Sequence, residues 1–398
     1  MKSFYRLSTS FWILMTLGAG FLSAVPAYAA PAAGQTLART LDVASGTRVS
    51  VENLAGRMEV SQGGKQLEVT AHVVAGGASQ ATAQALAKTV KLTVSRSSGH
   101  LDVHVDYPVS QYDRFVYRRV GDRKGDNRGN CLFGFLCGNS RSSLTYQGAD
   151  VQVFRQGGKG ARLYVDVVIK IPADVEANLT NHVGSLEASG LNNNVSLNGD
   201  NADVKAERVT GQVSVETGSG DVVLANLQGA VIVHTGSGDV SASDIKGNAN
   251  IHTGSGDIEG GNISGATLET KTGSGDVTLD GLSGALNVRT GSGDIRLTGV
   301  TALTGSTINT GSGDITLAGD LSRMQGFELG AGSGDITLST KQPPEVHLDI
   351  NTGSGDIEMH WRDVTHVYSS ENSFAGDIGS AKSVGRIHTG SGDVLLQE

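Results

Sequence analysis

One five-residue motif recurs through the second half of the chain and limits what it can fold into. Ala331-Gly-Ser-Gly-Asp335 is a nearly intact copy, and Ser373-Phe-Ala-Gly-Asp377 is a degenerate one that we expect to fill the longest gap. Fainter units end at Asp203 and Ser185. Neighbouring units lie 16 to 21 residues apart, a period typical of a solenoid. The intact copies of Thr-Gly-Ser-Gly-Asp end at Asp221, Asp239, Asp257, Asp276, Asp294, Asp314, Asp356 and Asp393.

Apolar residues keep a fixed place in each unit. A β-branched aliphatic residue follows the motif aspartate, and most units have a second apolar residue two positions further on. This alternation of apolar and polar residues predicts a strand. A second strand is expected before the motif, where an aliphatic residue lies six positions before the aspartate, with Thr270 as the exception. The positions after the aspartates predict one buried column through Val222, Val240, Ile258, Val277 and Ile295.

These units predict an all-β protein, a parallel β-helix of about twelve coils. The 56 glycines and the scarcity of helix formers agree with short strands joined by tight turns. Turns such as Asn226–Gly229 and Asp244–Gly247 each offer one apolar residue that can point inward. We expect a right-handed winding, because parallel crossovers have that hand.

The repeats, the segment Arg48–Val60 and the stretch Val165–Pro172 resemble a bacterial exported β-strand-repeat family of unknown function, whose members are called putative adhesins. The resemblance implies export and a β-solenoid. It implies no established catalysis and carries over no site residue.

The first 29 residues read as a signal peptide, with basic Lys2 and Arg6, an apolar stretch from Phe11 to Val25 and a small-residue cleavage site at Ala27–Ala29. We therefore expect a periplasmic, secreted or surface protein, with no membrane-spanning segment in the mature chain. The net charge of −9 becomes −11 after cleavage, which makes nucleic acid an unfavourable partner.

The region 30–175 is predicted to cap the solenoid, which we expect to occupy 176–398. We expect alternating strand over 47–74, a short helix over 78–89 and two strands over 91–105. An insertion at 111–147 interrupts this region with a local net charge of +4. Its aromatic residues include Tyr112, Phe115, Tyr117 and Tyr146.

The insertion is our candidate partner-binding surface, for an anionic envelope glycan, a lipid head group or an acidic protein face. The alternatives are that it covers the open apolar end of the rod or is merely disordered. In an oxidising compartment Cys131 and Cys137 are expected to form a disulfide across the insertion, rather than a metal site. The residues expected to contact a partner are Arg118, Arg119, Arg123, Lys124, Phe133 and Phe135.

The motif aspartates have two interpretations. In the favoured one glycine supplies a positive φ while Asp and Ser bond to turn amides. In the alternative one the stacked carboxylates bind calcium, although the calcium-binding nonapeptide has a different pattern and period. His234, His252 and His388 share an outward column that we interpret as a solvated ladder. The candidate calcium ligands are Asp221, Asp239, Asp257, Asp276, Asp294 and Asp314.

Enzymatic activity is the less favoured hypothesis. A polysaccharide-active β-helix would need long loops around convergent acids and bases, whereas these turns are nearly minimal. No nucleophile-elbow or zinc-protease motif occurs, and the motif lacks the lysine of a phosphate loop. We therefore expect a non-enzymatic binding or structural protein without a cofactor.

Overall fold

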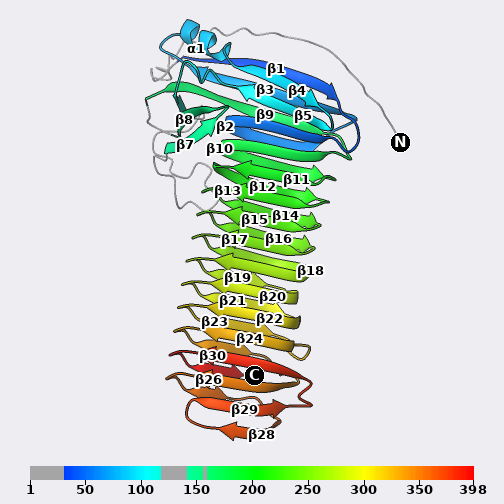
Figure 1. Cartoon of the computed structure of the whole chain (residues 1–398), viewed down its shortest axis with the longest axis vertical. Coiled ribbons are helices and arrows are strands. Elements are labelled where there is room, and N and C mark those ends of the chain that lie inside the picture. The colour runs from blue at the N-terminus through cyan, green and yellow to red at the C-terminus, as the bar shows by residue number, and fades with distance from the viewer. Residues whose placement is uncertain (1–30, 118–140, 156–158) are drawn as a thin grey trace, which may run out of the picture.

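The computed structural model describes residues 31–117, 141–155 and 159–398. Its 31 strands join into one continuous sheet, wound into a long rod with a broader N-terminal end (Figure 1). The prediction of an all-β solenoid is confirmed.

From residue 176 onward each coil of the rod has two strands, each paired in parallel with the equivalent strands of the neighbouring coils. Strand β10 (Glu176–Leu191) spans the first such coil by itself, and β18 (Ile258–Thr272) belongs to two coils. The next coil strands are β11 (Val195–Gly199), β12 (Asn201–Val209), β13 (Val213–Thr217), β14 (Val222–Gln228), β15 (Val231–Thr235), β16 (Val240–Lys246) and β17 (Ala249–Thr253). They are followed by β19 (Val277–Asp280), β20 (Ser283–Thr290), β21 (Ile295–Val300), β22 (Ala302–Thr310), β23 (Ile315–Gly319), β24 (Gln325–Ala331) and β25 (Ile336–Ser339).

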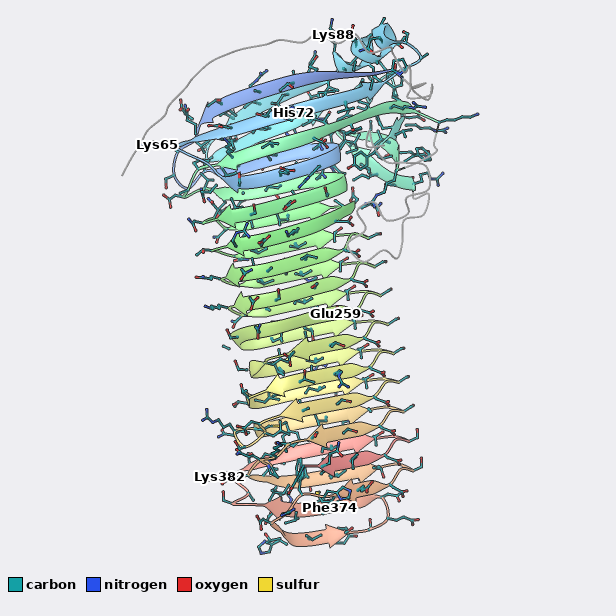
Figure 2. All side chains as sticks on the ribbon, turned by 180° about the vertical axis from the view of Figure 1, so that it is seen from behind. Lys65, His72, Lys88, Glu259, Phe374 and Lys382 are labelled. Atoms are coloured by element: carbon teal, nitrogen blue, oxygen red, sulfur yellow. The ribbon has the colours of Figure 1, made fainter. Side chains whose placement is uncertain are left out.

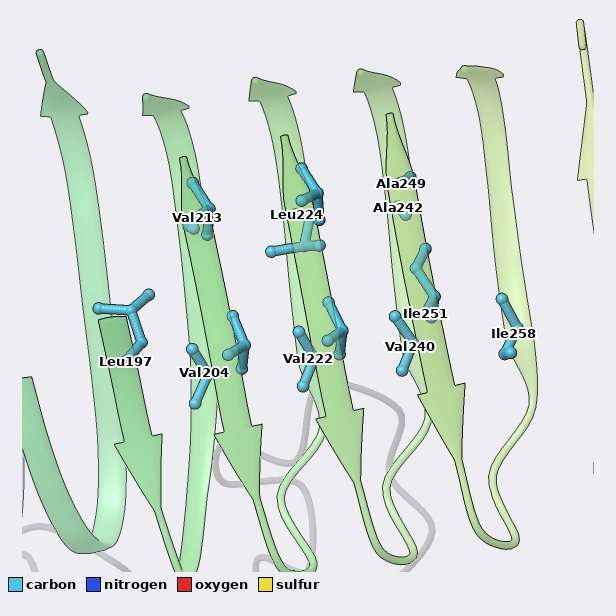
Figure 3. Packing of buried hydrophobic residues seen from close by; sticks show 14 of the residues in the cluster. Leu197, Val204, Val213, Val222, Leu224, Val240, Ala242, Ala249, Ile251 and Ile258 are labelled. Atoms are coloured by element: carbon cyan, nitrogen blue, oxygen red, sulfur yellow. The ribbon is translucent and has the colours of Figure 1, made fainter. Parts of the chain in front are cut away.

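The core of the rod consists of stacked aliphatic columns. Val222, Val240, Ile258, Val277 and Ile295 are all buried and follow one another in register, as predicted. Figure 3 shows this column beside the one that faces it. The exceptional Thr270 is also buried, and its hydroxyl has no hydrogen-bond partner.

The turn opposite the motif places a residue in the left-handed region in successive coils from Arg208 to Gly299. Asn226, Asp244 and Asn262 have φ of 54° to 55°, and glycine takes over at Gly281 and Gly299. The apolar residues that follow the first three, Leu227, Ile245 and Ile263, are buried. The prediction of a turn with one inward apolar residue is confirmed.

The N-terminal end is a sheet covered by one short helix. The expected strand over 47–74 is two strands, β2 (Arg48–Gln62) and β3 (Gln66–Gly76), because the chain turns between them. The helix α1 (Gln80–Ala87) begins at the capping box of Ser79 and Thr82. The other strands are β4 (Lys91–Ser97), β5 (His100–Asp106), β9 (Ala161–Ile171) and β1 (Ala32–Asp42), the last of which was not predicted.

Strand β2 pairs in parallel with β10 along its length, so the coil ladder continues into the N-terminal sheet. Three strands border the insertion: β6 (Arg114–Val116), β7 (Arg141–Tyr146) and β8 (Ala149–Phe154). Across the ranges that the structure describes, α1 has eight residues and no helix is long and apolar enough to cross a membrane.

The C-terminal coils do not stack in chain order. Strands β30 (Ser383–Thr389) and β31 (Val394–Gln397) lie between the coil β24–β25 and the coil of β26 (Val346–Thr352) and β27 (Ile357–Met359). The last coil along the chain is therefore an interior coil of the rod, as Figure 1 shows.

The degenerate unit ending at Asp377 was predicted to be a coil of this ladder, and this prediction is wrong. Its residues form β29 (Ser373–Ile378), which pairs antiparallel with β26 and with β28 (Val364–Ser369). The hairpin β28–β29 thus closes the end of the rod. The prediction failed because it rested on the Gly-Asp pair alone, and such a pair can also lie in an ordinary hairpin strand.

Candidate functional site

The Thr-Gly-Ser-Gly-Asp motif forms one corner of every repeat coil, and its threonine is buried there. The Thr253 hydroxyl accepts a hydrogen bond from Gly256 N at 3.1 Å and donates to Gly238 O of the preceding coil at 3.0 Å. Equivalent pairs of bonds are made by Thr217, Thr235, Thr272, Thr290, Thr310 and Thr389. Threonine, not the exposed motif serine, therefore makes the side-chain bond to the turn amide, which corrects our expectation.

The motif aspartates form a hydrogen-bonded ladder along the rod. The backbone N–H of Asp257 donates to Oδ1 of Asp239 at 2.9 Å, and Asp276 N donates to Oδ1 of Asp257 at 2.8 Å. The ladder follows the spatial order of the coils, since Asp393 N donates to Asp335 and Asp356 N to Asp393. One oxygen of these carboxylates is thus occupied by the next coil.

The motif glycines are required by close approach, not by a positive φ as predicted. Neither Gly236 nor Gly238 lies in the left-handed region. A Cβ on Gly238 would lie 1.9 Å from Gly220 O, and one on Gly236 would lie 2.4 Å from Gly218 O. The backbones of successive coils therefore occupy the space that a side chain would need.

The calcium hypothesis has no preformed cage to support it in the described parts of the chain. No group of three or more His, Cys, Asp or Glu side chains there is arranged to hold a metal ion. Burial raises the pKa of Asp203 and of Asp221, while hydrogen bonds from the amides of the next coil oppose that rise. The corner reads as a structural ladder, and ion binding by Asp221, Asp239, Asp257, Asp276, Asp294 and Asp314 is left to experiment.

The three histidines predicted to share one outward column do not all lie together. His234 and His252 lie in register on adjacent strands with ring centroids 5.3 Å apart, whereas His388 pairs with Gly330 and Asn351. Burial lowers the pKa of His252, opposed by Glu269 at 3.8 Å.

The proposed contact residues of the insertion lie outside the described residues. These are Arg118, Arg119, Arg123, Lys124, Phe133 and Phe135, and the same holds for the expected Cys131–Cys137 disulfide and the signal peptide.

The described borders of the insertion belong to the folded core. Phe115 and Tyr146 are fully buried and pack edge-on against the buried Tyr107, with ring centroids 5.5 and 5.9 Å away. Phe115 and Tyr146 are therefore unavailable to a partner, which corrects their inclusion among the interleaved surface aromatics. Tyr112 is exposed.

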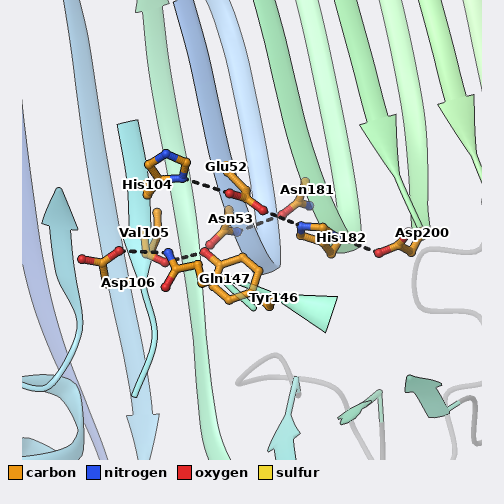
Figure 4. Close-up of polar contacts among 10 residues, drawn as sticks. All are labelled: Glu52, Asn53, His104, Val105, Asp106, Tyr146, Gln147, Asn181, His182 and Asp200. Atoms are coloured by element: carbon orange, nitrogen blue, oxygen red, sulfur yellow. Dashed lines mark hydrogen bonds and ion pairs between the residues drawn. The ribbon is translucent and has the colours of Figure 1, made fainter. Parts of the chain in front are cut away.

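A network of charged side chains joins the N-terminal sheet to the first coils, and no sequence pattern had indicated it. Glu52 on β2 accepts from His104 on β5 and from His182 on β10, both at 2.9 Å. The other ring nitrogen of His182 lies 2.7 Å from Asp200 (Figure 4). Four consecutive levels of the structure are thereby connected.

The charges in this network stabilise one another. Hydrogen bonds from His104 and His182 lower the pKa of Glu52 to about 2. Burial lowers the pKa of His182, but its bonds to Asp200 and Glu52 outweigh burial and raise it to about 9. Because both ring nitrogens of His182 are engaged by carboxylates, this imidazole is not free to act as a base or a metal ligand.

Buried amides lie beside the charged network. Asn53 donates to Oδ1 of Asn181 at 2.8 Å and to Val165 O, while Asn181 donates to Gly56 O. The pairing of β10 with the later coils places Asn181 at the corner that Thr217 occupies in the repeats. The network is thus the N-terminal continuation of the motif corner.

Shallow grooves hollow the outer face of the coils within the described residues. One of them, of about 490 Å³, is lined by both apolar and polar side chains. Among its lining residues are Asn248, Asn250, Glu269, Asn287 and Thr307.

The comparisons with known proteins give a family match over part of the chain and two distant structural likenesses. Residues 231–397 match the family model described as Toastrack DUF4097. No curated protein matches the sequence significantly.

Two crystal structures are similar in outline. One, a putative cell adhesion protein from Clostridium sporogenes, is 9% identical with a TM-score of 0.23, covering 92% of this chain and 99% of its own. The other, a putative adhesin from Bacteroides fragilis, is 14% identical with a TM-score of 0.29, covering 92% and 97%.

Proposed function

We propose that this chain is a non-enzymatic, exported envelope or surface protein that binds its partner in an adhesin-like manner. One observation carries the proposal: the polar side chains Thr and Asp of the repeat motif make hydrogen bonds within and between coils. A corner used in this way supports a rigid rod, and it leaves recognition to other parts of the chain.

The insertion is the proposed recognition element. Its sequence gathers basic and aromatic residues in a chain of net charge −9, which favours an anionic envelope glycan or lipid head group. Support comes from its borders, because Phe115 and Tyr146 are anchored against one buried ring, Tyr107. The segment between them begins and ends on a rigid base, and we propose that Cys131 and Cys137 close a loop within it.

Export to the periplasm, the cell surface or the medium is part of the same proposal and rests on the signal peptide at 1–29. Cleavage after Ala29 can be read directly by N-terminal sequencing of protein recovered from the envelope fraction.

The experiment is a binding assay with vesicles of anionic or neutral lipid and with acidic or neutral envelope glycans. We expect binding to the anionic probes, weakening as salt rises because exposed charges are screened within about 10 Å at 0.1 M. Replacing Arg118, Arg119, Arg123 and Lys124 with Ser should abolish most of this binding and leave the melting temperature unchanged.

A matched control removes the same charge from the rod. Lys246, Lys271, Arg289 and Arg296 are exposed, and their replacement with Ser should leave binding nearly intact. If both quadruple variants lose binding equally, only net charge matters. If the insertion variant binds as the parent does, recognition by the insertion is wrong and the coil grooves become the next candidates.

Calcium binding by the aspartate ladder is the alternative function. A comparison of the melting temperature in chelator and in added calcium distinguishes the two. A polysaccharide-active enzyme is the least favoured alternative, because the charged network around His182 offers no free base.

A further inference from the structure

The last coil of the chain fills a slot between two coils that precede it in sequence. Strand β30 pairs with β24 on one side and with β26 on the other, and β31 lies likewise between β25 and β27. Ile387, Val394 and Leu396 of this coil are buried. The slot must therefore stay open during folding until residues 383–397 enter it.

The bonds that hold the last coil in place are the generic bonds of the repeat. Thr389 donates to Gly334 O, and Asp393 N donates to Oδ1 of Asp335, as Thr253 and Asp257 do toward the coil before theirs. The buried Trp361 adds one bond, from its indole N–H to Gln397 O at 3.0 Å. The slot of one copy thus presents the same partners to the last coil of any other copy.

The hinge that leads into the last coil is short and strained. Residues 379–382 connect β29 to β30, and Gly379 and Ala381 both have positive φ, 60° and 48°. A left-handed conformation is unfavourable for alanine, because its Cβ crowds the following carbonyl oxygen. Short strained hinges favour exchange of a terminal element between copies, because opening the hinge relieves the strain.

Glu345, just before β26, holds this hinge closed. Its carboxylate accepts from the Ser380 hydroxyl and from Lys382 Nζ, both at 2.5 Å, and Lys382 N donates to its carbonyl. Figure 2 shows Lys382 on the side of the rod near its C-terminal end. These contacts exist only when the hinge is folded back.

We propose that residues 383–397 exchange between two copies of this chain during folding, which joins two rods at their C-terminal ends. Each copy then donates its last coil to the slot of the other, and every bond of the coil is kept while only the hinge changes. Since both edges of the coil are paired in the finished rod, exchange after folding requires loss of both ladders and is slow. The resulting dimer would carry two N-terminal ends, a bivalent arrangement if the proposed function holds.

The test uses cysteine pairs across the slot in full-length chains whose Cys131 and Cys137 are replaced by Ser. Glu328 on β24 and Arg386 on β30 are exposed register partners. Chains carrying only Glu328→Cys are co-expressed with chains carrying only Arg386→Cys, and disulfide-linked dimers are measured on non-reducing gels. The control pair is Lys271→Cys with Arg289→Cys, register partners on coils that follow one another in sequence.

Exchange predicts a linked dimer from the 328–386 pair and none above background from the control pair. Mixing the two chains after separate purification should give none. Glu345→Ala should raise the dimer-to-monomer ratio, and three glycines inserted after Ser380 should lower it.

A single chain carrying both Glu328→Cys and Arg386→Cys is the positive control, because it should form an internal disulfide in the closed monomer. If that disulfide forms while the separate chains yield no linked dimer, exchange is wrong. Equal dimer from the 328–386 pair and the control pair would also overturn it, since random collision would then explain both.

Discussion

The two corners of each coil obey different rules. At the motif corner, successive backbones lie so close that a Cβ on Gly238 would overlap a carbonyl oxygen, and Thr and Asp bond from coil to coil. At the opposite corner a glycine column also lies against the neighbouring backbone, since a Cβ on Gly229 would lie 2.3 Å from Gly211 O, but the left-handed position three residues earlier accepts Arg208, Asn226 and Asp244. Glycine is therefore required at both corners where the backbones of neighbouring coils meet, and residue identity varies at the left-handed position.

The motif corner also changes its chemistry along the rod. In the repeats it consists of Thr, Gly and Asp, but in the first levels Asn53 and Asn181 occupy the corner and the ion pairs of His182 reinforce it. The backbone groups at this sharp corner thus bond to asparagine amides at the N-terminal end and to threonine hydroxyls in the repeats. Substitutions at Gly238, Thr253, His182 and Asp257 test this contrast.

The largest effect is expected from Gly238→Ala. The added methyl would lie 1.9 Å from Gly220 O, so two coils must separate, at a cost of about 3 kcal/mol or more in the free energy of unfolding. Gly305→Ala is the matched control: its φ is 62° with nothing within 4 Å, so only the left-handed penalty of about 1 kcal/mol applies. Denaturant unfolding measures both. Equal losses of unfolding free energy in the two variants would show that the close approach of the coils at Gly238 does not matter.

Thr253→Val should cost about 2 kcal/mol, because it leaves Gly256 N–H and Gly238 O without their hydroxyl partner in a buried corner. Thr253→Ser keeps the hydroxyl and should lose less. The melting temperatures of the two variants test this order, and a valine variant as stable as the parent would show that the buried hydroxyl is dispensable.

The first levels should respond to pH in a way the repeats do not. The pKa of His182 is raised to about 9, so its stabilisation is complete below its ordinary value of 6.5 and is lost as pH rises toward 9. The pKa of Glu52 is lowered to about 2, so its contribution is complete above 4.5 and is lost as pH falls toward 2. His182→Gln should therefore flatten the decline in unfolding free energy between pH 6.5 and 9.

Part of that decline should survive in the variant, since hydrogen bonding to Glu52 also raises the pKa of His104. An unchanged slope in His182→Gln would mean that the network does not hold the N-terminal levels together.

The smallest effect is expected at the aspartate ladder. Asp257→Asn keeps the acceptor oxygen for Asp276 N and should be nearly neutral, whereas Asp257→Ala removes it and should cost about 1 kcal/mol. A large loss in the asparagine variant would show that the charge itself matters, which a structural ladder does not require.

The buried columns could be predicted from sequence because strands have a period of two and the motif fixes their phase, as Val222 and Val240 show. The stacking order of the last coils could not, since nearly identical motifs at Asp335, Asp356 and Asp393 make every order equally regular. The charged network was also missed: Glu52 and His182 are 130 residues apart, and the repeat pattern gives no reason to pair them. Long-range pairing of single residues leaves no local pattern.

The most direct test of the structural ladder is the melting temperature of the parent chain in excess chelator and in added calcium. If the motif side chains bond coil to coil and need no ion, the two melting temperatures should coincide, and Asp257→Asn should melt with the parent in both. A calcium-dependent rise of many degrees that is lost in Asp257→Asn would contradict the account and assign the ladder to ion binding.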